Sequence, residues 1–105
     1  MHFMVLAWDG TDDGAVERRK AARPAHGEYI GKLHADGTVV LGAGLLDDEG
    51  VIRGSLVITS HATRADVDTY IDGEPLNTGG AWERVEVHPV WIPDHYLPPR
   101  PPAAE

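Results

Sequence analysis

Residues 23–37, RPAHGEYIGKLHADG, combine a helical pattern with a histidine, His26, on the face predicted to pack against the core. The side chains that share this face, three, four and seven positions further along the helix, are those of Tyr29, Ile30 and Leu33. A partly buried imidazole donates or accepts a proton near neutral pH when a partner fixes its tautomer. The spacing makes His26 a candidate acid/base residue. The alternative is a packed histidine that bonds a backbone carbonyl.

Other residues of catalytic type lack the spacing that their chemistry requires. The histidines are scattered, without the paired spacing of zinc ligands, so no metal site is predicted. They are His2, His26, His34, His61, His88 and His95. Ser55 lies in no nucleophile-elbow motif, so we expect it to line a site rather than to attack a substrate. The GAG of residues 42–44 opens no helix, which argues against a phosphate or dinucleotide loop and favours a bulge or turn.

The composition indicates one compact acidic domain. The 105-residue chain has 17 acidic and 9 basic side chains, which give a formal net charge of −8. This charge would repel a phosphate backbone, so we expect no nucleic-acid partner. The chain has no cysteine, which excludes thiol catalysis and disulfides and fits a reducing compartment. No apolar run approaches the roughly 18 residues of a membrane span, so we expect a cytoplasmic protein without a membrane partner.

The elements that must position these residues alternate between strand and helix patterns. Residues 3–8, FMVLAW, predict a strand that runs into a loop of turn formers. A helical pattern follows from Ala15 to Gly37, and Pro24 inside it predicts a helix in two pieces. The β-rich runs TVVLGAGLL and VIRGSLVIT then predict an antiparallel pair of strands.

The second half of the chain repeats the helix and strand patterns. Thr63 and Asp66 form the capping box TRAD, which predicts a helix ending at Gly73. The turn GEPLNTGG leads to a last strand, AWERVEVHPVWI. This order is that of a ferredoxin-like βαββαβ fold of the α+β class, with four antiparallel strands covered on one face by two helices. We expect this domain over residues 1–92 and a proline-rich, disordered tail over residues 93–105.

The first strand predicts a further partner for the sheet. Its side chains are apolar on both sides, with Phe3, Val5 and Ala7 on one and Met4, Leu6 and Trp8 on the other. A sheet with one wet face would alternate apolar and polar residues. Two helices cover only one face, so the simplest cover for the other is a second copy of the chain. We therefore expect a face-to-face homodimer.

These stretches also carry a resemblance to the YCII (YciI-like) family, small ferredoxin-like proteins that form a dimeric α/β barrel. The resembling segments are FMVLAWDG, RPAH, the Gly54-Ser55 pair, EPLNTGG and VEVHP. Arg23 and His26 fall on the R-x-x-H helix motif of the family. The resemblance implies that His26 forms a catalytic pair with an acidic side chain from the turn before the last strand.

This turn departs from the family pattern. Glu74 and Leu76 stand where family members carry an aspartate and an aromatic residue. A glutamate keeps the carboxylate and adds one methylene, so it still accepts from the imidazole if the turn recedes by about an ångström. Asp72 is the alternative partner. The resemblance implies that His26 and Glu74 are catalytic, that Arg23 and Ser55 bind substrate, and that no cofactor takes part.

Three functions are compatible with these observations. The first is a cofactor-independent, lyase-like enzyme that moves a proton on a small molecule; the resemblance implies aromatic or enol-type substrates, since one relative is linked to dehydrochlorination of a hydroxyquinone. The alternative is a non-catalytic domain that binds a small molecule or serves a larger assembly. An oxygenase or haem-handling role rests on analogy of fold alone.

Overall fold

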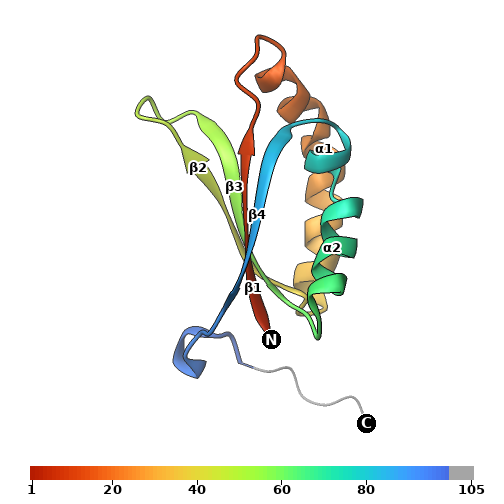
Figure 1. Cartoon of the computed structure of the whole chain (residues 1–105), viewed down its shortest axis with the longest axis vertical. Coiled ribbons are helices and arrows are strands. Elements are labelled where there is room, and N and C mark those ends of the chain that lie inside the picture. Colours follow the sequence, from red (N-terminus) through yellow and green to blue (C-terminus); the bar gives the residue numbers. More distant parts are fainter. Residues whose placement is uncertain (100–105) are drawn as a thin grey trace.

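The structure, a computed structural model, describes residues 1–99. Its four-stranded antiparallel sheet has the strand order β2-β3-β1-β4. The elements are β1 (His2–Asp9), α1 (Ala15–Ala35), β2 (Val39–Leu46), β3 (Ile52–Ser60), α2 (Arg64–Gly73), α3 (Pro75–Thr78), β4 (Trp82–Val90) and the 3-10 helix η1 (Asp94–Tyr96). Helices α1 and α2 lie on the same face of the sheet, and neither covers the opposite face (Figure 1). This arrangement confirms the predicted ferredoxin-like α+β fold.

The core lies between the sheet and these two helices. Phe3, Val5 and Ala7 of β1 are at most 4% exposed. Val67 and Tyr70 of α2 belong to the cluster that Phe3 and Val5 form. The β1 side chains of the opposite parity are only half-buried, as the alternating burial along the strand records. The strand is therefore apolar on a face that neither α1 nor α2 covers.

Helix α1 is continuous, so the prediction of two helical pieces is wrong. Pro24 lies in its interior, where a proline removes one backbone hydrogen bond and costs about 3 kcal/mol. Packing on both sides of the proline offsets this cost. Ala22 is buried before it, and Tyr29 and Ile30 pack against the core after it. One helix therefore presents all its inward side chains at fixed spacing.

The connection from β3 to β4 is more helical than predicted. The capping box of Thr63 and Asp66 starts α2 as expected. The segment predicted as a plain turn contains the short helix α3, which begins at Pro75. The Glu74 carboxylate caps α3 by accepting the Leu76 N–H, and a proline at the first helical position has no N–H to leave unpaired. Local capping therefore makes this turn a helix.

Residues 42–44 lie inside β2, so the prediction of a bulge or turn at this point is wrong. They pair in register with β3, from Gly42 opposite Val57 to Gly44 opposite Ser55. The irregularities of this pairing lie on either side of the three residues. The hydrogen bonds to β3 outweigh the low strand propensity of glycine.

The predicted tail is described only in part. Residues 93–99 contain η1, a single 3-10 turn. Residues 100–105 lie outside the described residues, and the prediction of disorder for them stays a prediction. Within residues 1–99, no helix is long and apolar enough to cross a membrane.

Candidate active site

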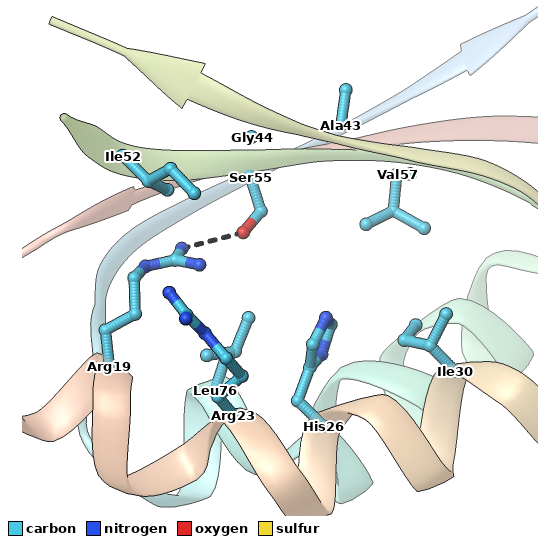
Figure 2. A pocket seen from close by; sticks show the side chains of 11 residues that line it. Arg19, Arg23, His26, Ile30, Ala43, Gly44, Ile52, Ser55, Val57 and Leu76 are labelled. Atoms are coloured by element: carbon cyan, nitrogen blue, oxygen red, sulfur yellow. Dashed lines mark hydrogen bonds between the residues drawn. The ribbon is translucent and has the colours of Figure 1, made fainter. Parts of the chain in front are cut away.

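A pocket of about 490 Å³ opens between α1 and the β2–β3 side of the sheet. Helix α1 lines it with Arg19, Arg23, His26 and Ile30, and β3 lines it with Ser55 and Val57. The small residues 42–44 and Leu76 complete the lining. In Figure 2 the basic side chains of α1 extend toward the β3 strand. The pocket therefore has polar donors on its helix side and several apolar walls.

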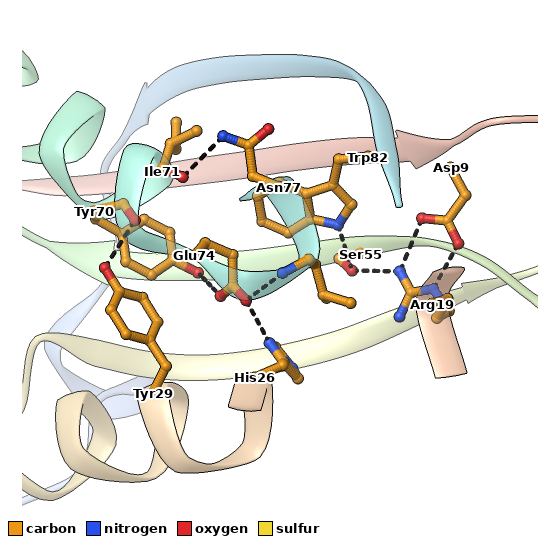
Figure 3. Close-up of polar contacts among 11 residues, drawn as sticks. Asp9, Arg19, His26, Tyr29, Ser55, Tyr70, Ile71, Glu74, Asn77 and Trp82 are labelled. Atoms are coloured by element: carbon orange, nitrogen blue, oxygen red, sulfur yellow. Dashed lines mark hydrogen bonds and ion pairs between the residues drawn. The ribbon is translucent and has the colours of Figure 1, made fainter. Parts of the chain in front are cut away.

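His26 and Glu74 are in direct contact (Figure 3). The imidazole Nδ1 lies 2.7 Å from Oε1 of Glu74. The Glu74 side chain is 0% exposed and that of His26 is 27% exposed, so the acid lies behind the ring and the ring meets the pocket. A carboxylate only accepts hydrogen bonds, so Nδ1 donates and Nε2 is left as the acceptor nitrogen of a neutral ring. Asp72, the alternative partner, is exposed on α2.

Glu74 is held by two further donors. The Leu76 N–H donates to Oε1 at 3.1 Å, and the hydroxyl of Tyr70 donates to Oε2 at 3.2 Å. Burial and the negative charge of Glu74 raise the pKa of Tyr70 well above its usual value, so the phenol keeps its proton. The Tyr29 hydroxyl in turn donates to the Tyr70 carbonyl at 2.8 Å. Both oxygens of the buried carboxylate therefore have donors.

A second polar cluster, separate from the contacts of Glu74, contributes Arg19 and Ser55 to the pocket lining (Figure 3). Arg19 and Asp9 form an ion pair whose side chains are 12% and 5% exposed. Arg19 Nη2 also donates to Ser55 Oγ at 2.9 Å, and the indole N–H of Trp82 donates to the same oxygen at 3.2 Å. The cluster ties β1, α1, β3 and the start of β4 together beside the pocket.

Comparison with known proteins places these features in a family. The YCII-related domain matches residues 1–91 of the chain. The chain belongs to the YCII-related domain family. A solved structure with the same fold is 5-chloro-2-hydroxyhydroquinone dehydrochlorinase (TftG) from Burkholderia phenoliruptrix AC1100, in complex with 2,5-dihydroxybenzoquinone. The two share 21% sequence identity and a TM-score of 0.76, over 90% of this chain and 98% of that one. Among curated proteins, no sequence matches.

In this YCII-related domain, the residues singled out from the sequence come together. Arg23, His26 and Ser55 line one pocket, and Glu74 lies behind His26. Arg23 is exposed at the pocket wall, one helical turn before His26. The four side chains come from α1, β3 and the cap of α3, which are far apart in the sequence.

Sequence reasoning missed Arg19, which lines the pocket of this YCII-related domain, and Asp9, which forms an ion pair with Arg19. The signal for Arg19 was its position four residues before Arg23, because this spacing sets both on one helix face. No comparable signal existed for Asp9, since a strand-end aspartate is also an ordinary turn residue. The sequence also carried no signal for the contact of the Tyr70 hydroxyl with Glu74.

Proposed function

We propose that this YCII-related domain is a small-molecule enzyme of the lyase type that transfers a proton through His26 and needs no cofactor. The observation that supports the proposal most is the 2.7 Å contact between Nδ1 of His26 and the fully buried carboxylate of Glu74. A histidine bonded in this way has a fixed tautomer and directs its basic nitrogen away from the acid. Such an arrangement suits a general base.

The proposed step begins when Nε2 of His26 takes a proton from a C–H or O–H of the substrate. The electron pair left on the substrate forms a new double bond and expels an anionic leaving group. The imidazolium keeps its Nδ1–H bond to Glu74, whose negative charge stabilises it. The proton then passes from Nε2 to solvent, so the substrate has lost one proton and one anion. Glu74 acts as the orienting partner in this sequence.

Aromatic or enol-type substrates are the proposed class. Ile30, Val57 and Leu76 offer apolar surface for a flat ring, and Arg23 and Ser55 are proposed to bind its polar groups. The name of the neighbour TftG, a dehydrochlorinase captured with a quinone, supports an elimination on this kind of molecule. The likeness to TftG, at 21% sequence identity, is one of fold, and the reaction and substrate class are carried over to this chain as part of the proposal.

Turnover of a panel of halogenated hydroquinones and hydroxyquinones tests the proposal. We expect His26→Gln to lower kcat/KM by about 10²- to 10⁴-fold, the usual contribution of a general base. His34→Gln is the matched control, because His34 is an exposed histidine of the same helix. Equal activity of the His26 and His34 variants would refute the assignment. Retained ligand affinity in His26→Gln, with no turnover by any variant, would favour the non-catalytic binding domain.

The tautomer provides a test that needs no substrate. We expect nitrogen NMR of the His26 ring to show a proton on Nδ1 and none on Nε2 in the neutral form. Glu74→Gln keeps an oxygen for this bond, whereas Glu74→Ala removes it, so only the alanine variant should mix the two tautomers. A ring that is protonated on Nε2 in the unmodified protein contradicts the proposed base.

We also propose that a second copy of the chain covers the open sheet face. Leu6 and Trp8 are only half-buried on that face, and Arg84 stacks over the Trp8 ring at 4.0 Å. Sedimentation at micromolar concentration should give the mass of two chains. Replacing Leu6 by Lys should shift this mass toward one chain, while Glu28→Lys, at an exposed position on α1, should leave it unchanged. A monomer in the unmodified protein would refute the dimer.

A further inference from the structure

The hydroxyl of Ser55 has a defined hydrogen-bond role. A serine oxygen has two lone pairs and one O–H. Both lone pairs are used, because Arg19 Nη2 and Trp82 Nε1 donate to this oxygen at 2.9 and 3.2 Å. Within residues 1–99, no side chain or carbonyl accepts the remaining O–H. Ser55 lines the pocket, so this O–H is available to donate to a ligand there.

Arg19 offers a second donor at the same place. Its Nε and Nη2 atoms are both engaged by Asp9. The described residues provide no acceptor for Nη1, and Arg19 lines the pocket. The Asp9 pair fixes the plane of the guanidinium, so the direction of Nη1 is set before any ligand arrives. A preoriented donor of this kind loses little entropy on binding.

Among the residues that the structure describes, the charged side chains that line the pocket are all of one sign. They are Arg19 and Arg23, and no aspartate or glutamate of residues 1–99 joins them. The two nearest carboxylates, Asp9 and Glu74, have side chains 5% and 0% exposed and face their own partners. This lining is unusual for a chain with 17 acidic and 9 basic side chains. Because these two carboxylates balance the formal charge of the two arginines, the preference for an anion comes from the charged donors that the pocket presents to a ligand and not from its net charge.

We propose that the pocket binds its substrate as an anion, with the charged oxygen held by Ser55 O–H, Arg19 Nη1 and the Arg23 guanidinium. These three groups form the oxyanion corner. The inference rests on the proposed function, because it assigns a substrate class to the same pocket: flat organic molecules that carry a carboxylate, phenolate or enolate oxygen. With the anion at this corner, the remainder of the molecule lies against Ile30 and Val57, toward His26.

Because both lone pairs of Ser55 Oγ are occupied, the oxyanion corner should not bind ligand groups that need a hydrogen-bond acceptor. A ligand amide N–H or ammonium finds no acceptor at Ser55, since both lone pairs are taken and both arginines only donate. Benzoate, benzamide and benzylammonium have one ring and differ in charge, so they probe the corner directly. We expect benzoate to bind at least about tenfold more tightly than benzamide, and benzylammonium not to bind, in NMR titrations of pocket resonances.

The decisive comparison is between Ser55→Thr and Ser55→Val, which have nearly the same shape and differ in the hydroxyl. Removing a hydrogen bond to a charged group should weaken benzoate binding about ten- to a hundredfold in the valine variant. The benzoate affinity of the threonine variant should stay within about threefold of that of the unmodified protein. Equal benzoate affinity in the two variants overturns the role of Ser55.

The valine variant also leaves Trp82 Nε1 without its acceptor and could lose affinity because it misfolds. A second variant, at Arg23, therefore tests the proposal without this change in the core. Arg23 is exposed, and Arg23→Gln should weaken benzoate about three- to fivefold, with Arg23→Lys closer to the unmodified protein. This effect should shrink as salt is added. No preference for benzoate over benzamide, or no binding of benzoate at all, overturns the proposal.

The same titration of His26→Gln separates the two proposals. We expect its benzoate affinity to stay within about twofold, because the corner lies one to two turns of α1 away from His26. Benzoate selectivity without any turnover would leave the oxyanion corner standing and refute proton transfer. Turnover that depends on His26 but not on Ser55 or Arg23 would support proton transfer and refute the oxyanion corner.

Discussion

Tyr70→Phe measures how much the hydrogen bond from the Tyr70 hydroxyl to the buried Glu74 carboxylate stabilises the fold. The change removes one hydroxyl, and with it the 3.2 Å bond to Oε2 of a carboxylate that is 0% exposed. A hydrogen bond to a charged group contributes about 1.5–3 kcal/mol, and the long distance places this bond near the lower value. We expect a loss of about 1.5 kcal/mol in urea unfolding at neutral pH. For a domain of this size the melting temperature should fall by roughly 6–12 °C.

The alkaline side of the stability curve gives an independent reading of the same contact. The pKa of Tyr70 is raised in the fold by burial and by Glu74. Above about pH 10 the unfolded chain loses this proton and the folded chain keeps it, so stability falls as pH rises. One such group contributes a slope of about 1.4 kcal/mol per pH unit. Tyr70→Phe removes this group, so the unfolding free energy of the variant should fall less steeply with pH above about pH 10, by up to this contribution.

Tyr29→Phe is the matched control for the urea measurement. It is no control for the alkaline slope, because burial also raises the pKa of Tyr29. Its hydroxyl bonds a neutral backbone carbonyl at 2.8 Å, so we expect a cost of about 1 kcal/mol or less. The reasoning fails if Tyr70→Phe costs no more than Tyr29→Phe, or if Tyr70→Phe keeps the alkaline slope of the unmodified protein. Either result would mean that Glu74 does not rely on the Tyr70 hydroxyl.

Three further predictions concern the fold around the site. Burial lowers the pKa of His61, so the unfolding free energy should fall as the pH drops below about 6.5. His61→Gln should make this fall smaller in urea titrations, and an unchanged fall would contradict the assignment to His61. Pro24→Ala should raise the unfolding free energy by about 1–2 kcal/mol, because the restored helical hydrogen bond outweighs the greater conformational entropy of the unfolded chain. A loss of stability would show that α1 requires the proline. Gly54→Ala places a Cβ 2.4 Å from the Ala7 carbonyl oxygen, so it should cost about 3 kcal/mol or more by thermal melting, and a neutral effect would exclude this close approach.

Most of the fold could be predicted because its signals are local. The capping box at Thr63 and the apolar runs of the strands depend on residues a few positions apart. The continuity of α1 through Pro24 could not be predicted in this way. It depends on contacts of Ala22 and Ile30 with elements far along the chain, and these outweigh the local preference.

The candidate site divides in the same manner. His26 was found from helical spacing, and its acidic partner came from the family resemblance rather than from any local pattern. The pair of Asp9 and Arg19 stayed hidden because an ion pair between a strand end and a helix exists only after the two elements pack. The second role of Glu74, as the cap of α3, could not be predicted, because the sequence indicated a plain turn at this point.

The edge strand β2 has a consequence for how relatives of this domain diversify. Gly42 and Gly44 pair with the inward-facing Val57 and Ser55, so this wall of the pocket is nearly bare backbone. A Cβ at Gly42 would approach no atom more closely than 4.0 Å, and one at Gly44 would first meet the side chain of Ile52. Larger residues at these positions would narrow the pocket while leaving the groups on α1 and α3 in place. Selection for a new substrate can therefore act on one peripheral strand, separately from the chemistry.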